Sequence, residues 1–350
     1  MFEELLKYAV NNGASDIHIT VGVPPTARIN GNLVPITQGS LGTADTEALA
    51  EEILSREYLE EYKKKGEIDL SYSVKGLGRF RVNVYRQRGS SSMALRIVAL
   101  DIPTLDQLGL PDSVRELSER TRGLVLVTGP TGSGKSTTLA AMIDLMNNRR
   151  NCHILTLEDP IEYLHRHNKS IVNQREIGHD SRSFATALRS ALRQDPDVIL
   201  VGEMRDLETI STAITAAETG HLVLSTLHTI GADKTIDRII DVFPPHQQQQ
   251  IRVQLSTVLQ GIISQNLIPR KDGKGRVPAV EVMVATPAIS NLIRAGKTQQ
   301  IMTSIQTGGK YGMQTMDAAL NKMYRDDIIS YENALLYCTS QEAFRRLADS

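Results

Sequence analysis

The sequence predicts an α/β protein in which a smaller α+β domain precedes a domain with a doubly wound sheet. Short apolar runs alternate with helical patterns from Gly123 onward, as they do where helices cover both faces of a parallel sheet. One of these runs leads through a glycine-rich loop into a helix. Ahead of them, helical patterns are mixed with strands of alternating polar and apolar residues. We therefore expect domains at residues 1–100 and 116–350, joined by a proline-containing linker at residues 101–115.

Composition and charge narrow the classes of protein. The 350 residues are 41% hydrophobic and 23% charged, which is typical of a globular protein. A net charge of −1 gives no global attraction to nucleic acid or anionic lipid. Two isolated cysteines, Cys152 and Cys338, exclude a C-x-x-C zinc module and a disulfide framework. No apolar run approaches the ~20 residues that span a bilayer, and the N-terminus lacks a signal-peptide pattern. We expect a cytoplasmic protein that binds neither zinc nor nucleic acid and does not insert into the membrane.

Local patterns in the first domain predict both helices and strands. Apolar residues at helical spacing predict one helix at residues 2–10 and one or two more across residues 46–64. Asn30-Gly31 predicts a type I′ turn within a β-hairpin. The strands are expected at residues 16–20, 26–29, 32–36, 69–74, 79–88 and 93–99.

The later strands of this domain carry several arginines opposite their apolar face. One interpretation is a solvated sheet surface. The other is that one or two of these arginines contact phosphate, because a planar guanidinium with a permanent charge suits that task. Such residues would complete a site between domains or between subunits. The set comprises Arg79, Arg81, Arg86, Arg88 and Arg96.

A phosphate-binding loop is the most specific local motif. The stretch Gly129-Pro130-Thr131-Gly132-Ser133-Gly134-Lys135-Ser136 fits G-x-x-x-x-G-K-[ST]. Thr137, which follows in the first helical turn, is expected to bind the nucleotide together with this stretch. An apolar strand at residues 123–128 precedes it and a helix follows, which is the required order. Loop amides and the helix N-terminus would hold phosphate, Lys135 would reach the β- and γ-phosphates, and Ser136 would bind Mg²⁺.

Polar residues follow the other strands expected in the second domain. Because ligands bind beyond the carboxyl ends of parallel strands, these residues are candidates for chemistry. Glu203 follows an apolar strand and would orient water or hold Mg²⁺ through water. Asp159 and Glu162 form a second acidic pair. His228 would sense the γ-phosphate, although an isolated histidine at a strand end is usually structural.

Further elements of the second domain follow from the same patterns. Strands are expected at residues 153–157, 198–201, 222–224 and 276–284. Helices are expected at residues 183–194, 207–219, 236–242 and 247–268, and as short segments at 288–295, 302–307, 316–324 and 331–338. The last four segments contain no recognisable catalytic or binding motif, and they indicate a helical packing surface.

The order and spacing of four motifs resemble the secretion ATPases that power type II secretion and type IV pili. They are the phosphate-binding loop, an acidic box, an acidic strand end of Walker B type and a histidine box. Residues 14–19 and 79–83 also resemble the pilus-retraction members of this family. So do residues 292–297, with Lys297 where the retraction signature has glutamate. The four motifs lie at residues 129–136, 157–163, 201–206 and 219–229.

The resemblance implies an N-terminal PAS-like domain joined flexibly to a RecA-like P-loop NTPase domain. Such proteins form homohexameric rings that bind ATP and Mg²⁺ between domains, act on an inner-membrane platform protein at the membrane's cytoplasmic face, and move pilin indirectly. Transferred by position, Glu203 is the catalytic acid, Glu162 and Asp159 belong to the acidic box, and His221 and His228 belong to the histidine box. Arg81 and Arg96 are the candidates to complete the site from the first domain.

Three functions stay open at this point. The first is a motor ATPase that retracts pili. The second is a motor ATPase of the same kind that drives pilus extension or type II secretion. The resemblance disfavours it, because those members usually carry a four-cysteine zinc element that this sequence lacks. The third is a weakly hydrolysing, nucleotide-dependent regulator of a motor ATPase, which the complete set of polar strand endings disfavours.

Overall fold

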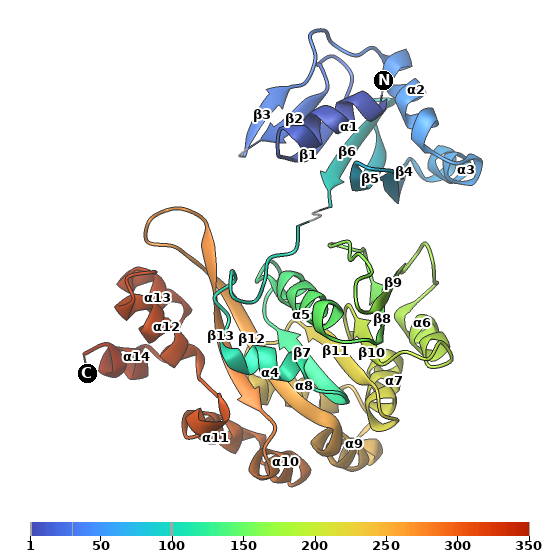
Figure 1. Ribbon diagram of the computed structural model, residues 1–350. Coiled ribbons are helices and arrows are strands. Elements are labelled where there is room, and N and C mark those ends of the chain that lie inside the picture. Colours follow the sequence, from blue (N-terminus) through green and yellow to red (C-terminus); the bar gives the residue numbers. More distant parts are fainter. Residues whose placement is uncertain (1, 30, 99–100, 350) are drawn as a thin grey trace. The chain divides into compact units, whose positions relative to one another are not determined.

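The computed structural model describes residues 2–29, 31–98 and 101–349 (Figure 1). The chain divides into two compact units. The first comprises Met1–Asp101 with Glu162–Leu164, and the second comprises Ile102–Ile161 and His165–Ser350. Each unit has its own sheet and its own hydrophobic core.

The first unit is an antiparallel sheet with helices on one face. The strand order is β3-β2-β1-β6-β5-β4, and each described neighbour pair is antiparallel. Side chains from all three helices pack on the sheet with Ile17, Val82 and Leu95. The elements are α1 (Phe2–Asn11), β1 (Ala14–Ile19), β2 (Thr26–Ile29), β3 (Asn32–Pro35), α2 (Thr43–Ile53), α3 (Arg56–Lys65), β4 (Glu67–Val74), β5 (Gly78–Gln87) and β6 (Ser90–Ile97).

The face of this sheet opposite its own helices carries a row of charged residues. The register places Asp16 of β1 opposite Arg96 of β6, and Arg96 opposite Arg81 of β5. Their strand neighbours Ile17, Val82 and Leu95 point the other way into the core, as the alternation of a strand requires. The expectation that arginines gather on one face is confirmed for this pair.

The second unit is built on a seven-stranded, mostly parallel sheet. Its order is β13-β12-β7-β11-β10-β8-β9, and only β13 runs antiparallel to its neighbour. β7 lies between β12 and β11, and all its residues are buried. The strands are β7 (Gly123–Thr128), β8 (His153–Glu158), β9 (Ile171–Glu176), β10 (Val198–Val201), β11 (Leu222–Leu227), β12 (Leu259–Pro269) and β13 (Arg276–Val284).

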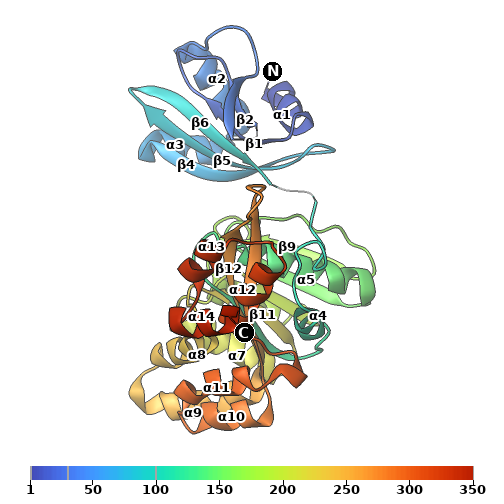
Figure 2. The same cartoon turned by 90° about the vertical axis from the view of Figure 1, so that its left-hand side faces the viewer.

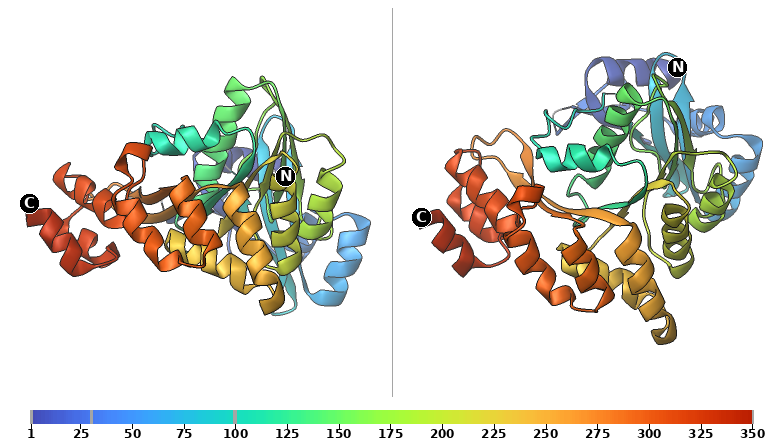
Figure 3. Two further views of the ribbon diagram at one scale, coloured as in Figure 1. Left: turned by 90° about the horizontal axis from the view of Figure 1, so that it is seen from below. Right: turned by 60° about the horizontal axis from the view of Figure 1, so that its bottom comes forward.

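Helices cover both faces of this sheet, which confirms the doubly wound class. One face packs on α4 and α5 through residues such as Val114 and Ile143. The other packs on α6 to α11, and α10 lies against both α9 and α11 (Figure 3). These helices are α4 (Asp112–Ser118), α5 (Lys135–Arg149), α6 (Phe184–Ala191), α7 (Leu207–Glu218), α8 (Ala232–Asp241), α9 (Pro245–Val258), α10 (Pro287–Arg294) and α11 (Ile301–Gln306), with 3₁₀ turns η1 (Thr298–Gln300) and η2 (Gly309–Tyr311).

A smaller cluster lies where the last helices meet β12 and β13. It joins Ile268 of β12 and Ala279 of β13 to Leu320 and Phe344. Figure 2 shows these helices gathered beside β12. They are α12 (Met316–Arg325), α13 (Tyr331–Tyr337) and α14 (Gln341–Asp349).

One predicted helix is wrong in its second half. The helix expected at residues 247–268 ends at Val258, and β12 follows without a loop. β12 is buried on both faces, so its apolar residues form a run with no period of two, and such a run resembles a buried helix. Gly261 marks the difference, because a Cβ there would lie 2.7 Å from the Leu117 side chain. β9 and α14 were also not predicted.

Helix α4 begins inside the segment expected as a linker, and Pro111 is its N-cap residue. The predicted turn at Asn30-Gly31 lies outside the described residues because it includes Asn30. In the parts of the chain that the structure describes, we find no helix long and apolar enough to cross a bilayer.

Candidate active site

The phosphate-binding loop follows β7 and is shaped by its glycines. Gly129 has φ 140°, and a Cβ there would lie 2.2 Å from the carbonyl oxygen of Gln265. Gly134 has φ 86° and caps α5, which has no side-chain hydrogen bond at its N-cap. Glycine adopts these backbone conformations readily, whereas residues with a Cβ rarely do. The loop therefore presents backbone amides and a helix N-terminus, which together favour an anion.

Lys135 is held inside this loop. Its side chain is largely buried, and its ammonium group donates to the carbonyl oxygens of Gly129 at 2.9 Å and Pro130 at 3.0 Å. Ser136 and Thr137 are half-buried in the first turn of α5, and Thr131 and Gly132 are exposed at the loop tip. The cation thus lies within the loop, where it would meet bound phosphate.

Gln265 of β12 supports the loop from behind. Its Nε2 donates to the carbonyl oxygen of Ser133 at 2.7 Å, and its Oε1 accepts from the hydroxyl of Thr138 at 2.7 Å. The residue is 2% exposed. Sequence reasoning missed Gln265 because it placed this residue in a helix.

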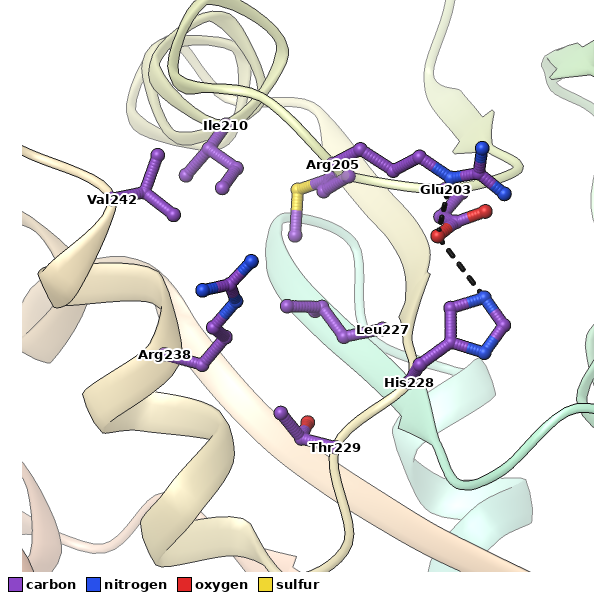
Figure 4. A pocket seen from close by; sticks show the side chains of 9 residues that line it. Glu203, Arg205, Ile210, Leu227, His228, Thr229, Arg238 and Val242 are labelled. Carbon is purple, nitrogen blue, oxygen red and sulfur yellow. Dashed lines mark ion pairs between the residues drawn. The ribbon is translucent and has the colours of Figure 1, made fainter.

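Glu203 and His228 meet at the ends of neighbouring strands β10 and β11. The Oε1 of Glu203 lies 3.0 Å from Nε2 of His228 and 2.7 Å from Nε of Arg205 (Figure 4). The Nδ1 of His228 lies 3.5 Å from the hydroxyl of Thr131 in the phosphate-binding loop. Both residues predicted at the strand ends are thus brought together beside that loop.

The charge state of Glu203 follows from these partners. Partial burial raises the pKa of its carboxyl, but the hydrogen bond from Arg205 and the charges of His228 and Arg205 outweigh burial and lower that pKa. Glu203 is therefore an anion at neutral pH. An ionised carboxylate beside a phosphate site can orient a water molecule and accept its proton.

Main-chain and hydroxyl bonds fix the strand ends to one another. The N–H of Gly129 donates to the Leu227 carbonyl oxygen at 3.3 Å, and the N–H of Met204 donates to that of Thr226 at 3.2 Å. The hydroxyl of Thr226 donates to the carbonyl oxygen of Gly202 at 2.6 Å. The hydroxyl of Thr226 thus has a hydrogen-bond partner although it lies in a buried strand.

A pocket of about 380 Å³ opens beside Glu203 and His228. Figure 4 shows the guanidinium of Arg238, from α8, pointing into it. Apolar side chains of Ile210, Leu227 and Val242 line the remaining walls. Sequence reasoning did not single out Arg205 or Arg238.

The acidic box is not assembled as a group around Glu203. Glu158 accepts hydrogen bonds from Thr156 at 2.6 Å and Gln174 at 3.1 Å. Asp159 and Glu162 are exposed. Asp159 acts on Arg205 through its charge, since the pKa of Arg205 is raised first by its hydrogen bond to Glu203 and also by Asp159.

Two other predicted residues are not part of this group. Glu162 is exposed and belongs to the first unit, whereas the phosphate-binding loop and Glu203 belong to the second. His221 lies just before β11, at the opposite end from His228, and its Nδ1 lies 2.9 Å from the Ala216 carbonyl oxygen. The two members of the histidine box therefore lie at opposite ends of one strand, and only His228 contacts Glu203.

The two candidate arginines lie in the first unit. Arg81 is exposed on β5. The Nε of Arg96 donates to Oδ1 of Asp16 at 3.0 Å. Partial burial raises the pKa of Asp16, but hydrogen bonds from Ser15 and Arg96 outweigh it and lower that pKa. Arg96 is thus already paired within its own sheet, whereas Arg81 lies across from it in register.

Known proteins resemble this chain over most of its length. The family model described as type II/IV secretion system protein matches residues 1–335. The type IV pilus retraction ATPase PilT of Pseudomonas aeruginosa is 50% identical over 95% of this chain and 96% of its own length. A twitching motility protein of Neisseria gonorrhoeae is 46% identical over 89% of this chain and 83% of its own. The crystal structure of the pilus retraction motor PilT with bound ADP is 51% identical, covers 98% of each chain and has a TM-score of 0.91.

Proposed function

This chain belongs to the type II/IV secretion system protein family, and we propose that it is a motor ATPase that drives type IV pilus retraction. One observation carries the chemistry. An ionised Glu203, bonded to His228, lies at a strand end beside the glycine loop that holds Lys135. Similarity to a pilus retraction ATPase over almost the whole of both chains supports retraction as the work that hydrolysis performs.

The residues divide the reaction into binding and hydrolysis. The amides of the loop and the ammonium of Lys135 bind the phosphates of ATP and balance their charge. Glu203 orients water for attack on the γ-phosphorus and accepts its proton, since its carboxyl is ionised. His228 holds the carboxylate of Glu203 and would donate toward the γ-phosphate in this proposal.

Magnesium fits this site as a companion of the nucleotide. Mg²⁺ keeps phosphate oxygens and water as ligands, so it needs few protein groups. The Ser136 hydroxyl, in the first turn of α5, would be its direct protein ligand. Glu203 and Asp159 would act through water. When bound, Mg²⁺ neutralises charge that develops on the phosphates.

The first unit supplies the remaining charge in this proposal. Arg81 and Arg96 stand side by side on the sheet face opposite the unit's own helices, where a guanidinium can meet phosphate. In a homohexamer, an arginine from one domain or subunit would complete the site of another. Hydrolysis would then move the domains and act on an inner-membrane platform protein, and through it on pilin. The chain would work in the cytoplasm, peripheral to the inner membrane.

Turnover by the purified protein tests the enzyme. We expect ATP hydrolysis by the wild type, and none above background for Lys135→Ala or Glu203→Ala. Glu208→Ala is the matched control, because Glu208 is a surface carboxylate on α7 that pairs only with Arg189 among the described ion pairs. Wild-type turnover no faster than Glu203→Ala would contradict a motor and favour a regulator.

Deletion in the host tests the direction of work. Loss of a retraction motor leaves more pili on the surface and abolishes twitching, and complementation with Glu203→Ala does not restore it. Fewer surface pili after deletion would contradict retraction and favour extension or secretion.

A further inference from the structure

Neighbouring residues of β12 each contact a different loop of the candidate site. Gln265 faces α5 and bonds to the phosphate-binding loop. Ser264 faces α8, and its hydroxyl accepts from the N–H of Gly231 at 2.9 Å. Gly231 ends the loop that begins with His228. Both residues are 2% exposed. One strand thus holds the loop that binds phosphate and the loop that carries His228.

The contact of Gln265 fixes an amide of the phosphate-binding loop. The carbonyl oxygen of Ser133 can only accept, so Nε2 of Gln265 must face it and Oε1 must face Thr138. In a trans peptide the carbonyl and the next N–H point in opposite directions. Holding the Ser133 carbonyl outward therefore aims the N–H of Gly134 into the loop, toward a phosphate.

The carbonyl oxygen and the side chain of Gln265 leave the loop little room to shift toward β12. A Cβ at Gly129 would lie 2.2 Å from the carbonyl oxygen of Gln265, and one at Gly134 would lie 2.9 Å from its Nε2. The two ends of the loop thus rest against a single residue. A change in Gln265 should alter phosphate binding directly.

The His228 loop is held by a pair of side chains across the β12–β13 hairpin. Ser264 of β12 lies opposite Glu281 of β13. They accept from consecutive amides, since the Ala232 N–H donates to Oε1 of Glu281 at 2.9 Å. Helix α8 has no side-chain cap of its own at Gly231, so these two residues replace it. Glu281 is 2% exposed, and burial raises its pKa.

We propose that the β12–β13 hairpin sets the geometry of both loops, with Gln265 positioning the nucleotide-binding loop and Ser264 with Glu281 positioning His228. The inference rests on the proposed ATPase activity for its second half only. Nucleotide affinity should depend on Gln265, and the rate of hydrolysis should depend on Ser264 and Glu281. Because Ser264 and Gln265 are adjacent on one strand, displacement of β12 would move both loops together.

The first test measures ADP affinity with a fluorescent ADP analogue and full-length protein. Gln265→Met keeps the length but not the hydrogen bonds, and we expect roughly tenfold weaker binding. Thr138→Val removes only the bond to Oε1 and should have a smaller effect in the same direction. Asn147→Leu is the matched control, since Asn147 is a buried amide at the far end of α5 that donates to the Arg166 carbonyl oxygen.

Thermal unfolding of the same variants separates positioning from stability. We expect Gln265→Met and Asn147→Leu to lower the unfolding midpoint similarly, whereas only Gln265→Met weakens ADP binding. Unchanged ADP affinity in a folded Gln265→Met would overturn this half of the proposal. If Gln265→Met does not fold, unchanged ADP affinity in Thr138→Val would overturn it instead. This test needs no turnover, so it stands even if the protein does not hydrolyse ATP.

The second test compares kcat for ATP hydrolysis with ADP affinity in the same variants. We expect Ser264→Ala and Glu281→Leu to lower kcat by roughly tenfold with ADP affinity unchanged. Glu281→Gln retains an acceptor oxygen for the Ala232 N–H and should keep most of the wild-type kcat. Equal losses of kcat and ADP affinity in Ser264→Ala, or a kcat of Glu281→Gln as low as that of Glu281→Leu, would overturn the assignment.

Discussion

The carboxylate of Glu203 and the imidazole of His228 come from the ends of adjacent parallel strands and lie 3.0 Å apart. Neither residue is close to the other in sequence, so the sheet order β11-β10 creates the pair. The loop on the other side of β11 is the one that we propose to bind phosphate, and it contacts His228 through Thr131. A shift of either side chain should therefore displace the other and change the contacts of a bound nucleotide.

Substitution of His228 tests whether this residue acts by holding the carboxylate of Glu203. His228→Gln keeps a donor for the Glu203 carboxylate, whereas His228→Ala leaves that carboxylate with Arg205 alone. Because hydrogen bonds to charged groups contribute about 1.5–3 kcal/mol, we expect kcat to fall roughly tenfold or more in His228→Ala and less in His228→Gln. Steady-state turnover measures both. Equal kcat values for the two variants would contradict a role through Glu203.

Arg205 should set the acid limit of activity. Its hydrogen bond and charge lower the pKa of Glu203 below the ordinary value of 4.5. In the proposed reaction Glu203 acts as an anion, so we expect turnover to be lost only as pH falls through this lowered pKa. Arg205→Ala removes the lowering effect, and we expect the acid limb of the kcat profile to move to higher pH.

The stability of the folded protein is the control for this shift in the pH profile. Arg205 is mostly exposed, so its loss should change the free energy of unfolding by less than about 1 kcal/mol. Profiles are measured from roughly pH 3 to 7, so that they extend below the ordinary glutamate pKa, with folding monitored by circular dichroism. If the acid limb of the kcat profile in Arg205→Ala stays in place or moves to lower pH, Arg205 does not lower the pKa of Glu203.

Much of this site could be predicted because its signals are local. The phosphate-binding loop needs glycine at positions of positive φ, a lysine and a hydroxyl in fixed order, and each is visible in a short stretch. Glu203 and His228 follow apolar runs, and the rule that ligands bind at strand ends places them together. The doubly wound class follows from the same runs.

The remaining contacts depend on long-range geometry. Gln265 was hidden because a strand buried on both faces has no alternating pattern, and only the position of β12 beside β7 brings it to the loop. The partner of Arg96, Asp16, depends on the register of β1 and β6, which no local signal fixes. Arg205 lies beside Glu203 in sequence, but its ion pair depends on where the chain turns after β10.

Removal of Mg²⁺ should expose the role of Ser136. Chelation is expected to abolish turnover in the wild type, since phosphate charge would be left unbalanced. Ser136→Ala removes the one direct protein ligand that we propose, so half-maximal turnover should need roughly tenfold more Mg²⁺. A titration of Mg²⁺ at saturating ATP measures this. Thr137→Ala, at the next position of the same turn, is the comparison, and an equal Mg²⁺ requirement in Ser136→Ala and the wild type would contradict ligation by Ser136.

Arg81 and Arg96 of the first unit should act on the site of another chain or domain. We expect Arg81→Ala and Arg96→Ala to lower kcat by as much as about 10³-fold, the lower end for an arginine that stabilises phosphoryl transfer, with ADP affinity unchanged. Asp16→Asn controls for Arg96, because it releases the guanidinium without removing it and should keep most of the activity.

Mixing variants tests whether the arginines act between subunits. Arg81→Ala has an intact phosphate-binding loop, whereas Lys135→Ala has intact arginines. If the arginine of one subunit serves the loop of the next, mixed rings contain some complete sites and recover part of the wild-type turnover, although either variant alone is inactive. Recovery should rise and then fall with the mixing ratio, because a complete site needs one chain of each kind. Turnover that never exceeds the sum of the two separate variants would place the arginine and the loop in the same chain.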